Sequence, residues 1–177
     1  MIELITNIPH PIHLVDSLCN PLLFATLSKD FPLVFITNFT LKRLLLSPLL
    51  QTARSLGFSV EILTIPEGEQ AKTEETFLSL HKQLTRLSIP RQATLIGVGG
   101  GVILDIVGFV AATHCRGMPF IAIPTTLVAM IDASIGGKNG INLDHIKIAS
   151  ALFIYPRMYG SALMCSLLSH IKNGFKE

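Results

Sequence analysis

Apolar residues along the chain fall into short runs that alternate with longer amphipathic stretches. Runs of strand length occupy residues 33–37, 59–64, 93–98 and 119–123, and helical patterns occupy residues 41–56, 73–87 and 102–113. Strands and helices that alternate over short connections are typical of a parallel sheet with helices on both faces. The pattern therefore predicts an α/β fold.

Punctuating residues set the expected ends of these elements. Pro48 predicts a kink or break inside the helix over 41–56, and Gly57 predicts the end of that helix. Thr73 is the expected N-cap of the helix that follows. Residues 1–15 fit an added strand or a hairpin.

Composition narrows the class of protein. The chain is 49% hydrophobic and 15% charged, which is typical of a globular domain rather than a disordered one. Its formal net charge of +2 is too small to indicate a nucleic acid or an anionic membrane as a partner. Cys19, Cys115 and Cys165 are far apart, which favours a reducing cytoplasm over a disulfide framework. No basic segment precedes an apolar run at the N-terminus, so we expect no signal peptide.

One stretch raises the alternative of a membrane span. Residues 93–112 are apolar over roughly the 20 residues that a spanning helix needs. Asp105 lies in the middle of this run, which also holds three consecutive glycines. A buried strand followed by a buried helix explains both features, so we predict no membrane segment here.

The glycine triplet is the first candidate for chemistry. Gly99, Gly100 and Gly101 stand between a predicted strand and a predicted helix. Glycines permit a tight turn and a close approach to a phosphate, and the helix N-terminus supplies free N–H groups. The triplet alone fits a purely structural turn equally well, and the match to GxGxxG is incomplete because Leu104 fills its last position.

Polar motifs follow the neighbouring strands. In the segment Pro66–Lys72, Glu69 is a candidate acceptor for ribose hydroxyls and Lys72 a candidate partner for Glu69, although an exposed charged turn explains the segment too. Residues 124–126 (PTT) place two hydroxyls at a carboxyl edge of the sheet, where ligands bind in open α/β folds. The glycine-rich loop 132–140, which carries Lys138, suits a phosphate or a polyhydroxy anion, or is a surface turn.

Together these motifs resemble one family. The segments PEGEQAKT, GGGVILDIVGFVAATHCRG and IPTTLVAMIDASIGGKNGIN, with the lysine that follows, are similar in order and spacing to 3-dehydroquinate synthases. The resemblance covers residues 1–147. It implies a Rossmann-like sheet and the conversion of 3-deoxy-D-arabino-heptulosonate 7-phosphate into 3-dehydroquinate and phosphate, a step of the shikimate pathway of aromatic amino-acid biosynthesis. It also implies NAD and zinc or another divalent metal as cofactors, a small sugar phosphate as substrate, and leaves a homodimer open.

The resemblance assigns site residues by position. The residues that match the NAD site are Glu67, Gly68, Glu69, Gln70, Ala71, Lys72, Gly100, Gly101, Val102, Ile103, Leu104, Asp105, Thr125 and Thr126. Asp132, Lys138 and Lys147 match residues that face the nicotinamide and the substrate. Arg116 matches an arginine that looks across a dimer interface toward the substrate phosphate. Leu104 stands where the family usually has glycine; its side chain would crowd the turn, although this position contributes chiefly backbone.

The resemblance stops after Lys147. A family-like continuation, Lys-Asn-Arg-Ile-Gly-Ser-Phe-Tyr-Leu-Pro-Lys, turns into the observed KIASALFIYPR when one base is deleted from suitable codons. We therefore expect 1–147 to be an NAD-binding domain and 148–177 an out-of-frame tail. The family's helical second domain, which donates a Glu and two His to the metal, would then be missing, so we expect no metal site in this chain. Sequencing the gene around codon 147 tests this expectation.

These observations predict a truncated 3-dehydroquinate synthase without turnover of its own. Two alternatives stay open. One is an NAD-dependent polyol or alcohol dehydrogenase, which would produce net NADH. The other is a non-catalytic NAD-binding remnant, which would bind the nucleotide without turnover.

Overall fold

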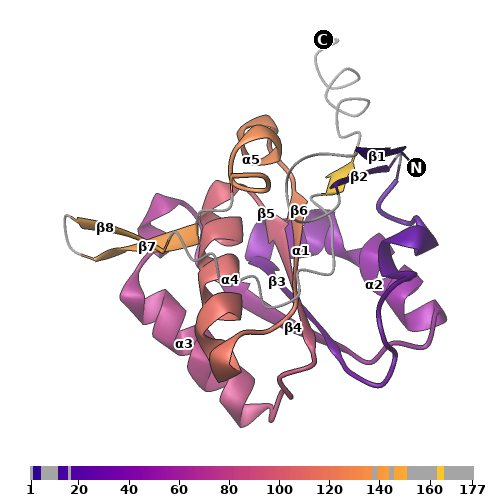
Figure 1. Cartoon of the computed structure of the whole chain (residues 1–177), viewed down its shortest axis with the longest axis horizontal. Helices are drawn as coiled ribbons and strands as arrows, with labels where there is room; N and C mark the ends of the chain where they lie inside the picture. The colour runs from indigo at the N-terminus through magenta and orange to yellow at the C-terminus, as the bar shows by residue number, and fades with distance from the viewer. Residues whose placement is uncertain are drawn as a thin grey trace.

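The computed structural model describes residues 2–4, 12–15, 17–136, 139–143, 146–150 and 163–165. At its centre lies a sheet of four parallel strands, β3 (Leu33–Asn38), β4 (Val60–Ile65), β5 (Thr94–Gly99) and β6 (Phe120–Pro124) (Figure 1). Each strand coincides with one of the four predicted apolar runs to within about a residue. The predicted α/β fold is confirmed.

The strand order is β4-β3-β5-β6. Strand β3 pairs with β4 on one side and with β5 on the other, so that Leu33 lies opposite both Val60 and Thr94. The direction of the crossovers therefore reverses between β3 and β5. Ligands of open α/β sheets bind beyond the carboxyl ends of the strands at such a reversal. The topology thus directs attention to the ends of β3 and β5.

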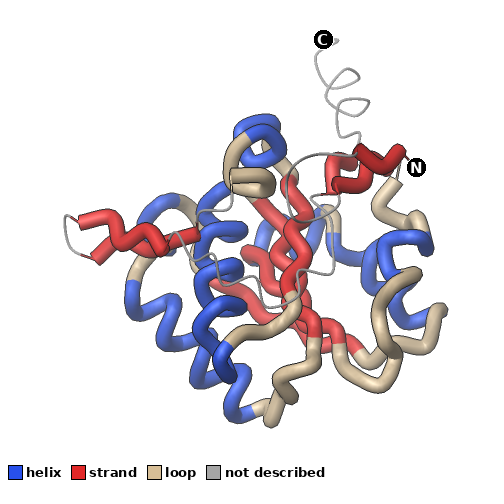
Figure 2. The backbone as a smooth tube through the Cα atoms, viewed as in Figure 1, coloured by secondary structure: helices blue, strands red, loops and turns tan. Residues whose placement is uncertain are grey.

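Helices cover both faces of the sheet (Figure 2). Helix α2 (Leu46–Ser55) covers one face, with α1 (Phe39–Leu44) before it, and α3 (Glu74–Arg86) and α4 (Gly101–Thr113) cover the other. Successive residues of β3 point to opposite faces. Leu33 and Phe35 pack in the cluster that contains α2, whereas Val34 and Ile36 pack in the cluster with α3 and α4. Burial on both faces explains why β3, β5 and β6 read as continuous apolar runs.

The predicted helix over 41–56 is broken, but not where the sequence suggested. The break falls at Leu45 (φ −121°, ψ −23°), and Pro48 lies inside the first turn of α2. The first N–H groups of a helix have no partner within it, so proline costs little there. Gly57 follows α2 with φ +90°, and its predicted role as the helix end is confirmed.

Helix α3 begins as predicted. The Thr73 hydroxyl accepts a hydrogen bond from the N–H of Thr76 (3.4 Å). Helix α4 follows the glycine turn and has 13 residues. Within the described residues, no helix combines the length and the apolar character needed to cross a membrane, because the apolar stretch 93–112 is divided between β5 and α4.

Shorter elements complete the chain. These are β1 (Ile2–Leu4), β2 (Ile12–Val15), β7 (Asn139–Leu143), β8 (Ile146–Ser150), β9 (Leu163–Cys165), α5 (Leu127–Ile131), and the 3₁₀ turns η1 (Pro21–Phe24), η2 (Glu69–Ala71) and η3 (His114–Arg116). Strands β1 and β2 pair antiparallel, as the hairpin expectation for 1–15 required, and β9 pairs parallel to β2. Strands β7 and β8 form a hairpin whose second strand contains residue 147. Most of the expected out-of-frame tail, residues 151–162 and 166–177, lies outside the described residues.

Candidate nucleotide-binding site

Three of the predicted motifs meet at one edge of the sheet. The segment Pro66–Lys72 follows β4, the glycine triplet ends β5, and Thr125 follows β6. The N–H of Thr125 donates to the carbonyl of Gly99 (2.9 Å). The Thr37 hydroxyl, near the end of β3, donates to the carbonyl of Val98 (2.8 Å) and is buried. These bonds fix the ends of β3, β5 and β6 relative to one another.

The glycine turn depends on space rather than on an unusual backbone. Gly100 has φ −76°, which any residue adopts. A Cβ on Gly99 would lie 2.3 Å from Cδ1 of Ile103, and one on Gly100 would lie 3.4 Å from Cγ2 of Thr126. On Gly101 the nearest atom, Cβ of Ala133, would be 3.8 Å away, an ordinary contact. Gly99 is therefore the position where a side chain fits least.

The amino end of α4 is open to a ligand. Gly100 is its N-cap residue and offers no side-chain hydrogen bond to the first turn. The first N–H groups of a helix lack partners within it, and together with the helix dipole they favour an anion. This end of α4 can therefore bind a phosphate.

Leu104 does not crowd the turn. Its side chain is fully buried in the core with β3 and β5, and it contributes its N–H to the carbonyl of Gly100 (3.2 Å). Ile103 is buried as well, and Val102 packs against the same core. These residues contribute backbone rather than side chains to the edge.

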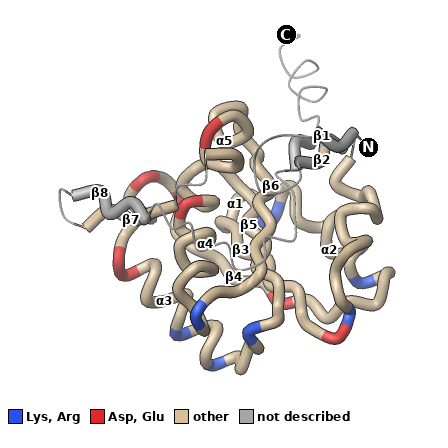
Figure 3. Tube along the Cα trace, in the orientation of Figure 1, with Lys and Arg blue, Asp and Glu red and all other residues tan. Residues whose placement is uncertain are grey.

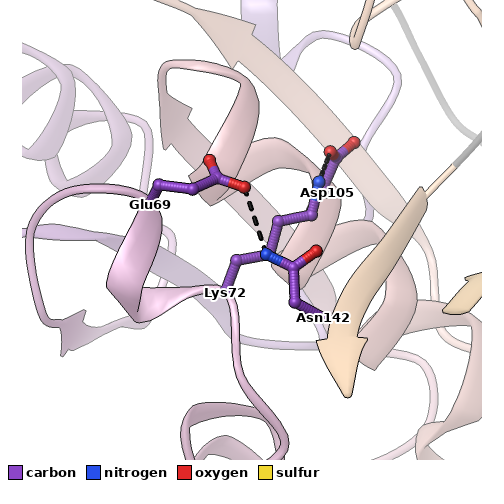
Figure 4. A network of polar contacts seen from close by, with 4 residues as sticks. All are labelled: Glu69, Lys72, Asp105 and Asn142. Carbon is purple, nitrogen blue, oxygen red and sulfur yellow. Dashed lines mark hydrogen bonds and ion pairs between the residues drawn. The ribbon is translucent and has the colours of Figure 1, made fainter. Parts of the chain in front are cut away.

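Lys72 forms an ion pair with Asp105 (Figure 4). The two side chains are 15% and 19% exposed, so the pair is well shielded from water. The sequence suggested Glu69 as the partner of Lys72. Instead, Oε1 of Glu69 accepts a hydrogen bond from the Asn142 side chain (3.2 Å), because strand β7 lies alongside Lys72 and its backbone N–H at Asn142 donates to the Lys72 carbonyl (2.8 Å). Lys72 therefore joins α4 to the segment after β4.

The carboxyl group of Asp105 has competing influences. Burial raises its pKa, while the hydrogen bond and charge of Lys72 act in the opposite direction. The charges of Asp132 and Glu69 add to the rise. Acidic residues are drawn around α5 and the beginnings of α3 and α4 in Figure 3, whereas basic residues lie at the far ends of α3 and α4. This edge thus offers acceptors for hydroxyl groups, with the N–H groups of α4 for an anion.

A cavity of about 430 Å³ adjoins this network. Its lining residues are Glu69, Gln70, Thr73, Glu74, Glu75, Asn142 and Leu143. Oδ1 of Asn142 is buried and has no hydrogen-bond partner among the described residues. Such an acceptor is expected to be satisfied by a ligand or by water. The sequence did not single out Asn142, because one amide in a short strand carries no signal of its own.

The remaining predicted NAD residues have mixed roles. Oε1 of Glu67 accepts the N–H of Thr40 at the start of α1 (3.1 Å), and hydrogen bonds from Thr40 lower the pKa of Glu67. Ala71 is fully buried, so it can offer only backbone. Gly68 has φ +81° and Gln70 is exposed beside it. The Thr126 hydroxyl caps α5 by accepting the N–H of Ala129 (3.2 Å).

The predicted catalytic residues are only partly brought together. Asp132 is exposed at the end of α5, close enough to Asp105 to affect its pKa. Arg116 is exposed at the opposite end of α4, about 20 Å along the helix axis from the glycine turn at 1.5 Å per residue. Lys138 lies outside the described residues. Lys147 belongs to β8, but its side chain lies outside the described part.

One polar contact was missed entirely. Nδ1 of His81 and Nδ1 of His114 are 2.8 Å apart, between α3 and the end of α4. The sequence indicated no role for either histidine, because the two are 33 positions apart and neither has an acidic neighbour at ligand spacing. Only the packing of the two helices reveals the pair.

Comparison with known sequences identifies the motifs. A sequence model described as 3-dehydroquinate synthase N-terminal matches residues 62–169, a range that contains every motif of the candidate site. The 3-dehydroquinate synthase of Chlamydia muridarum (strain MoPn / Nigg) is 80% identical over 157 residues, which are 89% of this chain and 42% of that protein. That of Chlamydia abortus (strain DSM 27085 / S26/3) is 48% identical over 89% of this chain and 41% of that protein. The chain thus spans less than half the length of these relatives.

Solved structures share the fold. A 2-epi-5-epi-valiolone synthase from Streptomyces hygroscopicus subsp. jinggangensis 5008, with NAD+ and Zn2+ bound, has a TM-score of 0.68 and 25% identity, over 92% of this chain and 44% of that one. A 2-deoxy-scyllo-inosose synthase complexed with carbaglucose-6-phosphate, NAD+ and Co2+ has a TM-score of 0.72 and 21% identity, over 87% and 41% of the two chains. An iron-containing alcohol dehydrogenase from Thermococcus thioreducens has a TM-score of 0.67 at 16% identity, over 93% and 47%. The last two likenesses show the fold alone.

Proposed function

Because this chain belongs to the 3-dehydroquinate synthase family, we propose that it forms the NAD-binding part of that enzyme. The observation that carries the proposal is the uncapped amino end of α4, which adjoins Thr126 and bears the Lys72–Asp105 pair one turn further on. Two synthases of similar fold are described with NAD+ bound, which supports this choice of nucleotide.

The residues at the sheet edge suggest how the nucleotide is held. The N–H groups of residues 101–103 bind the pyrophosphate, since no side chain caps them. Asp105 accepts hydrogen bonds from ribose hydroxyls, and Lys72 fixes the orientation of its carboxylate. Glu69 and the unpaired Oδ1 of Asn142 line the adjoining cavity and accept from the rest of the nucleotide. The residues that we propose to line the NAD site, by resemblance to the family, are Glu67 to Lys72, Gly100 to Asp105, Thr125 and Thr126.

The complete enzyme would convert 3-deoxy-D-arabino-heptulosonate 7-phosphate into 3-dehydroquinate and phosphate. When bound, NAD supplies a reversible hydride acceptor. Asp132 extends the edge toward the substrate, and Lys138, Lys147 and Arg116 supply positive charge to its carboxylate and phosphate groups. The sugar phosphate analogue in a synthase of similar fold supports this substrate class. The placement of Arg116 at the far end of α4 suits a role across a homodimer interface.

The family's divalent metal is not assigned to this part of the chain. Among the described residues, no three His, Cys, Asp or Glu side chains are grouped closely enough to hold an ion. A reducing cytoplasm suits Cys19 and Cys115, which are exposed free thiols, and we propose that location.

Calorimetric titration of NAD into the 177-residue chain tests the proposed function. Asp105→Asn removes the charge that pairs with Lys72, and we expect at least about a tenfold loss of affinity, since a hydrogen bond to a charged group contributes roughly 1.5–3 kcal/mol. Asp30→Asn is the matched control, because Asp30 is exposed and bonds only to its neighbour Ser28 in the described structure. Equal binding by both variants would contradict the assignment of Asp105, and no binding by the parent chain would contradict the proposal itself.

A second assay separates the proposal from a polyol or alcohol dehydrogenase. The proposed synthase would use NAD catalytically, so no net NADH is expected from the enzyme with the sugar phosphate. Accumulation of NADH with glycerol as substrate would favour the dehydrogenase instead.

A further inference from the structure

The contact between His81 and His114 belongs to a chain of hydrogen bonds. Nδ1 of each ring faces Nδ1 of the other at 2.8 Å, and Nε2 of His81 lies 3.2 Å from the hydroxyl of Thr113. That hydroxyl also lies 2.7 Å from the carbonyl of Phe109. His114 is buried, with 7% of its surface exposed, and His81 is half-buried against Phe77. The Nδ1–Nδ1 contact is therefore partly shielded from water, whereas Thr113 at the other end of the chain of hydrogen bonds is exposed.

Proton counting decides the direction of each bond. The Thr113 hydroxyl lies 2.7 Å from the carbonyl of Phe109 and 3.3 Å from that of Val110, and since a carbonyl can only accept, we assign the single hydroxyl proton to the shorter contact, with Phe109. The Thr113 oxygen then accepts from Nε2–H of His81. A neutral imidazole carries one N–H, so Nδ1 of His81 is left as an acceptor and His114 must donate from its own Nδ1. His114 is thereby placed in the Nδ1–H tautomer.

The chain of hydrogen bonds ends at His114, which leads directly into a strained turn. Cys115 and Arg116, directly after His114, have φ +50° and +64°, and Gly117 has φ +107°. Left-handed backbone is unfavourable for the two residues with side chains, so surrounding contacts must hold it. One contact is the N–H of Gly117 to the carbonyl of His114 (2.9 Å), and another is Nε of Arg91 to the carbonyl of Gly117 (3.2 Å). The ring of His114 supplies the connection to α3.

We propose that the two imidazoles form a proton-sensitive latch between α3 and α4, closed when His81 is neutral and opened when its Nδ1 is protonated. With a proton on that nitrogen, two N–H groups oppose each other across 2.8 Å and the hydrogen bond is lost. A proton on Nε2 of His114 leaves the bond intact, so His81 is the sensing residue. Opening releases the turn that presents Arg116. This inference does not depend on the bound nucleotide.

The electrostatic surroundings favour the neutral form of His81, in which the latch is closed. Burial and the charge of His114 lower the pKa of His81 to about 4, and burial lowers the pKa of His114. The charged residues on the elements around the pair are Glu74, Glu75, Lys82 and Arg86 on α3, Asp105 on α4, and Arg116 on the turn. In the described part of the chain, the salt bridge found joins Lys72 to Asp105, and none reaches either imidazole.

Nitrogen-15 NMR of the labelled full chain near pH 7.5 tests the tautomers directly. We expect His81 to be protonated at Nε2 and His114 at Nδ1, the less common tautomer of free imidazole. Thr113→Ser keeps the acceptor and should preserve both shifts. Thr113→Val removes it, so the reversed pair, with His81 donating to His114, should become populated. Protonation of His114 at Nε2 in the parent chain, or identical spectra for the valine and serine variants, would overturn the proposed direction.

A second measurement tests the latch. His81→Gln supplies a non-titrating side chain that can still accept from His114 and donate to Thr113. Between pH 7 and 3.5, a range that crosses the pKa of His81, the backbone amide signals of Cys115, Arg116 and Gly117 should shift and gain mobility in the parent chain, and should do so several-fold less in the glutamine variant. His13→Gln, on β2, is the matched control and should respond as the parent does. Equal acid responses of the turn in all three proteins would overturn the proposal.

Discussion

At the scale of single residues, the glycine turn separates three glycines that look equivalent in the sequence. Gly99 lies against the side chain of Ile103, Gly100 lies near Thr126, and Gly101 has room for a Cβ atom. A phosphate-binding role needs the backbone of all three, yet only Gly99 is required by packing. The distinction can be measured as stability.

Gly99→Ala should lower the free energy of unfolding by about 1–3 kcal/mol, the usual cost of overpacking a core. The new methyl group would lie 2.3 Å from Cδ1 and 2.9 Å from Cβ of Ile103, and the Cβ atom cannot move away by rotation. Gly101→Ala is the control and should change stability by less than about 0.5 kcal/mol. Urea denaturation followed by circular dichroism gives both values, and equal losses would contradict the packing argument.

At the scale of elements, α3 connects the cavity to the histidine latch. Thr73 caps the first turn of α3. The backbone of Thr73 pairs with that of Asn142 on β7, and Asn142 lines the cavity. The position of Asn142 in the cavity thus depends on where α3 begins.

Thr73→Ala should destabilise the chain by about 1 kcal/mol, because the N–H of Thr76 loses its acceptor. Thr73→Ser keeps a hydroxyl in place and should recover most of that loss. Thermal unfolding of the two variants provides the comparison. If serine were as damaging as alanine, the threonine methyl group rather than the cap would be the important feature.

The elements were also the part of the fold that the sequence predicted best. Strands buried on both faces, such as β3 with Phe35 and Ile36, produce apolar runs that need no tertiary information. The sequence placed the helix break at Pro48, whereas the structure has it at Leu45. Proline is tolerated in the first turn of a helix, so Pro48 marks the start of α2 rather than a kink.

The candidate site was predicted in outline only. The glycine turn and its neighbours carry family motifs, and their segments do meet at one edge. Lys72 and Asp105 are 33 positions apart, as are His81 and His114, and both contacts follow from tertiary packing that no local pattern encodes.

At the scale of the whole molecule, the buried histidines should make stability depend on pH. The pKa of His81 drops from 6.5 to about 4 on folding, so the unfolded chain binds the proton more readily. Its contribution to stability is therefore complete above pH 6.5 and is lost as the pH falls toward 4. The raised pKa of Asp105 acts in the opposite sense, since its carboxyl favours folding when protonated, below pH 3.8, and loses that contribution as pH rises through its folded pKa.

The parent chain should thus lose melting temperature between pH 7 and 4.5, and His81→Gln should lose less over the same interval. His13→Gln again serves as the control and should follow the parent. Scanning calorimetry at the two pH values decides the matter. If the melting temperature of the His81 variant fell by as much as that of the parent, the pH dependence would arise from other groups in the chain.

The bond from Thr125 to Gly99 has a consequence for synthesis on the ribosome. The glycine turn emerges before β6, but the N–H that donates to the Gly99 carbonyl belongs to Thr125, and the side chain nearest to Gly100 belongs to Thr126. Chains fold from the N-terminus as they are made. A nascent chain that stops short of residue 126 therefore presents the turn without its neighbouring strand, so the proposed nucleotide site is complete only after β6 has left the exit tunnel.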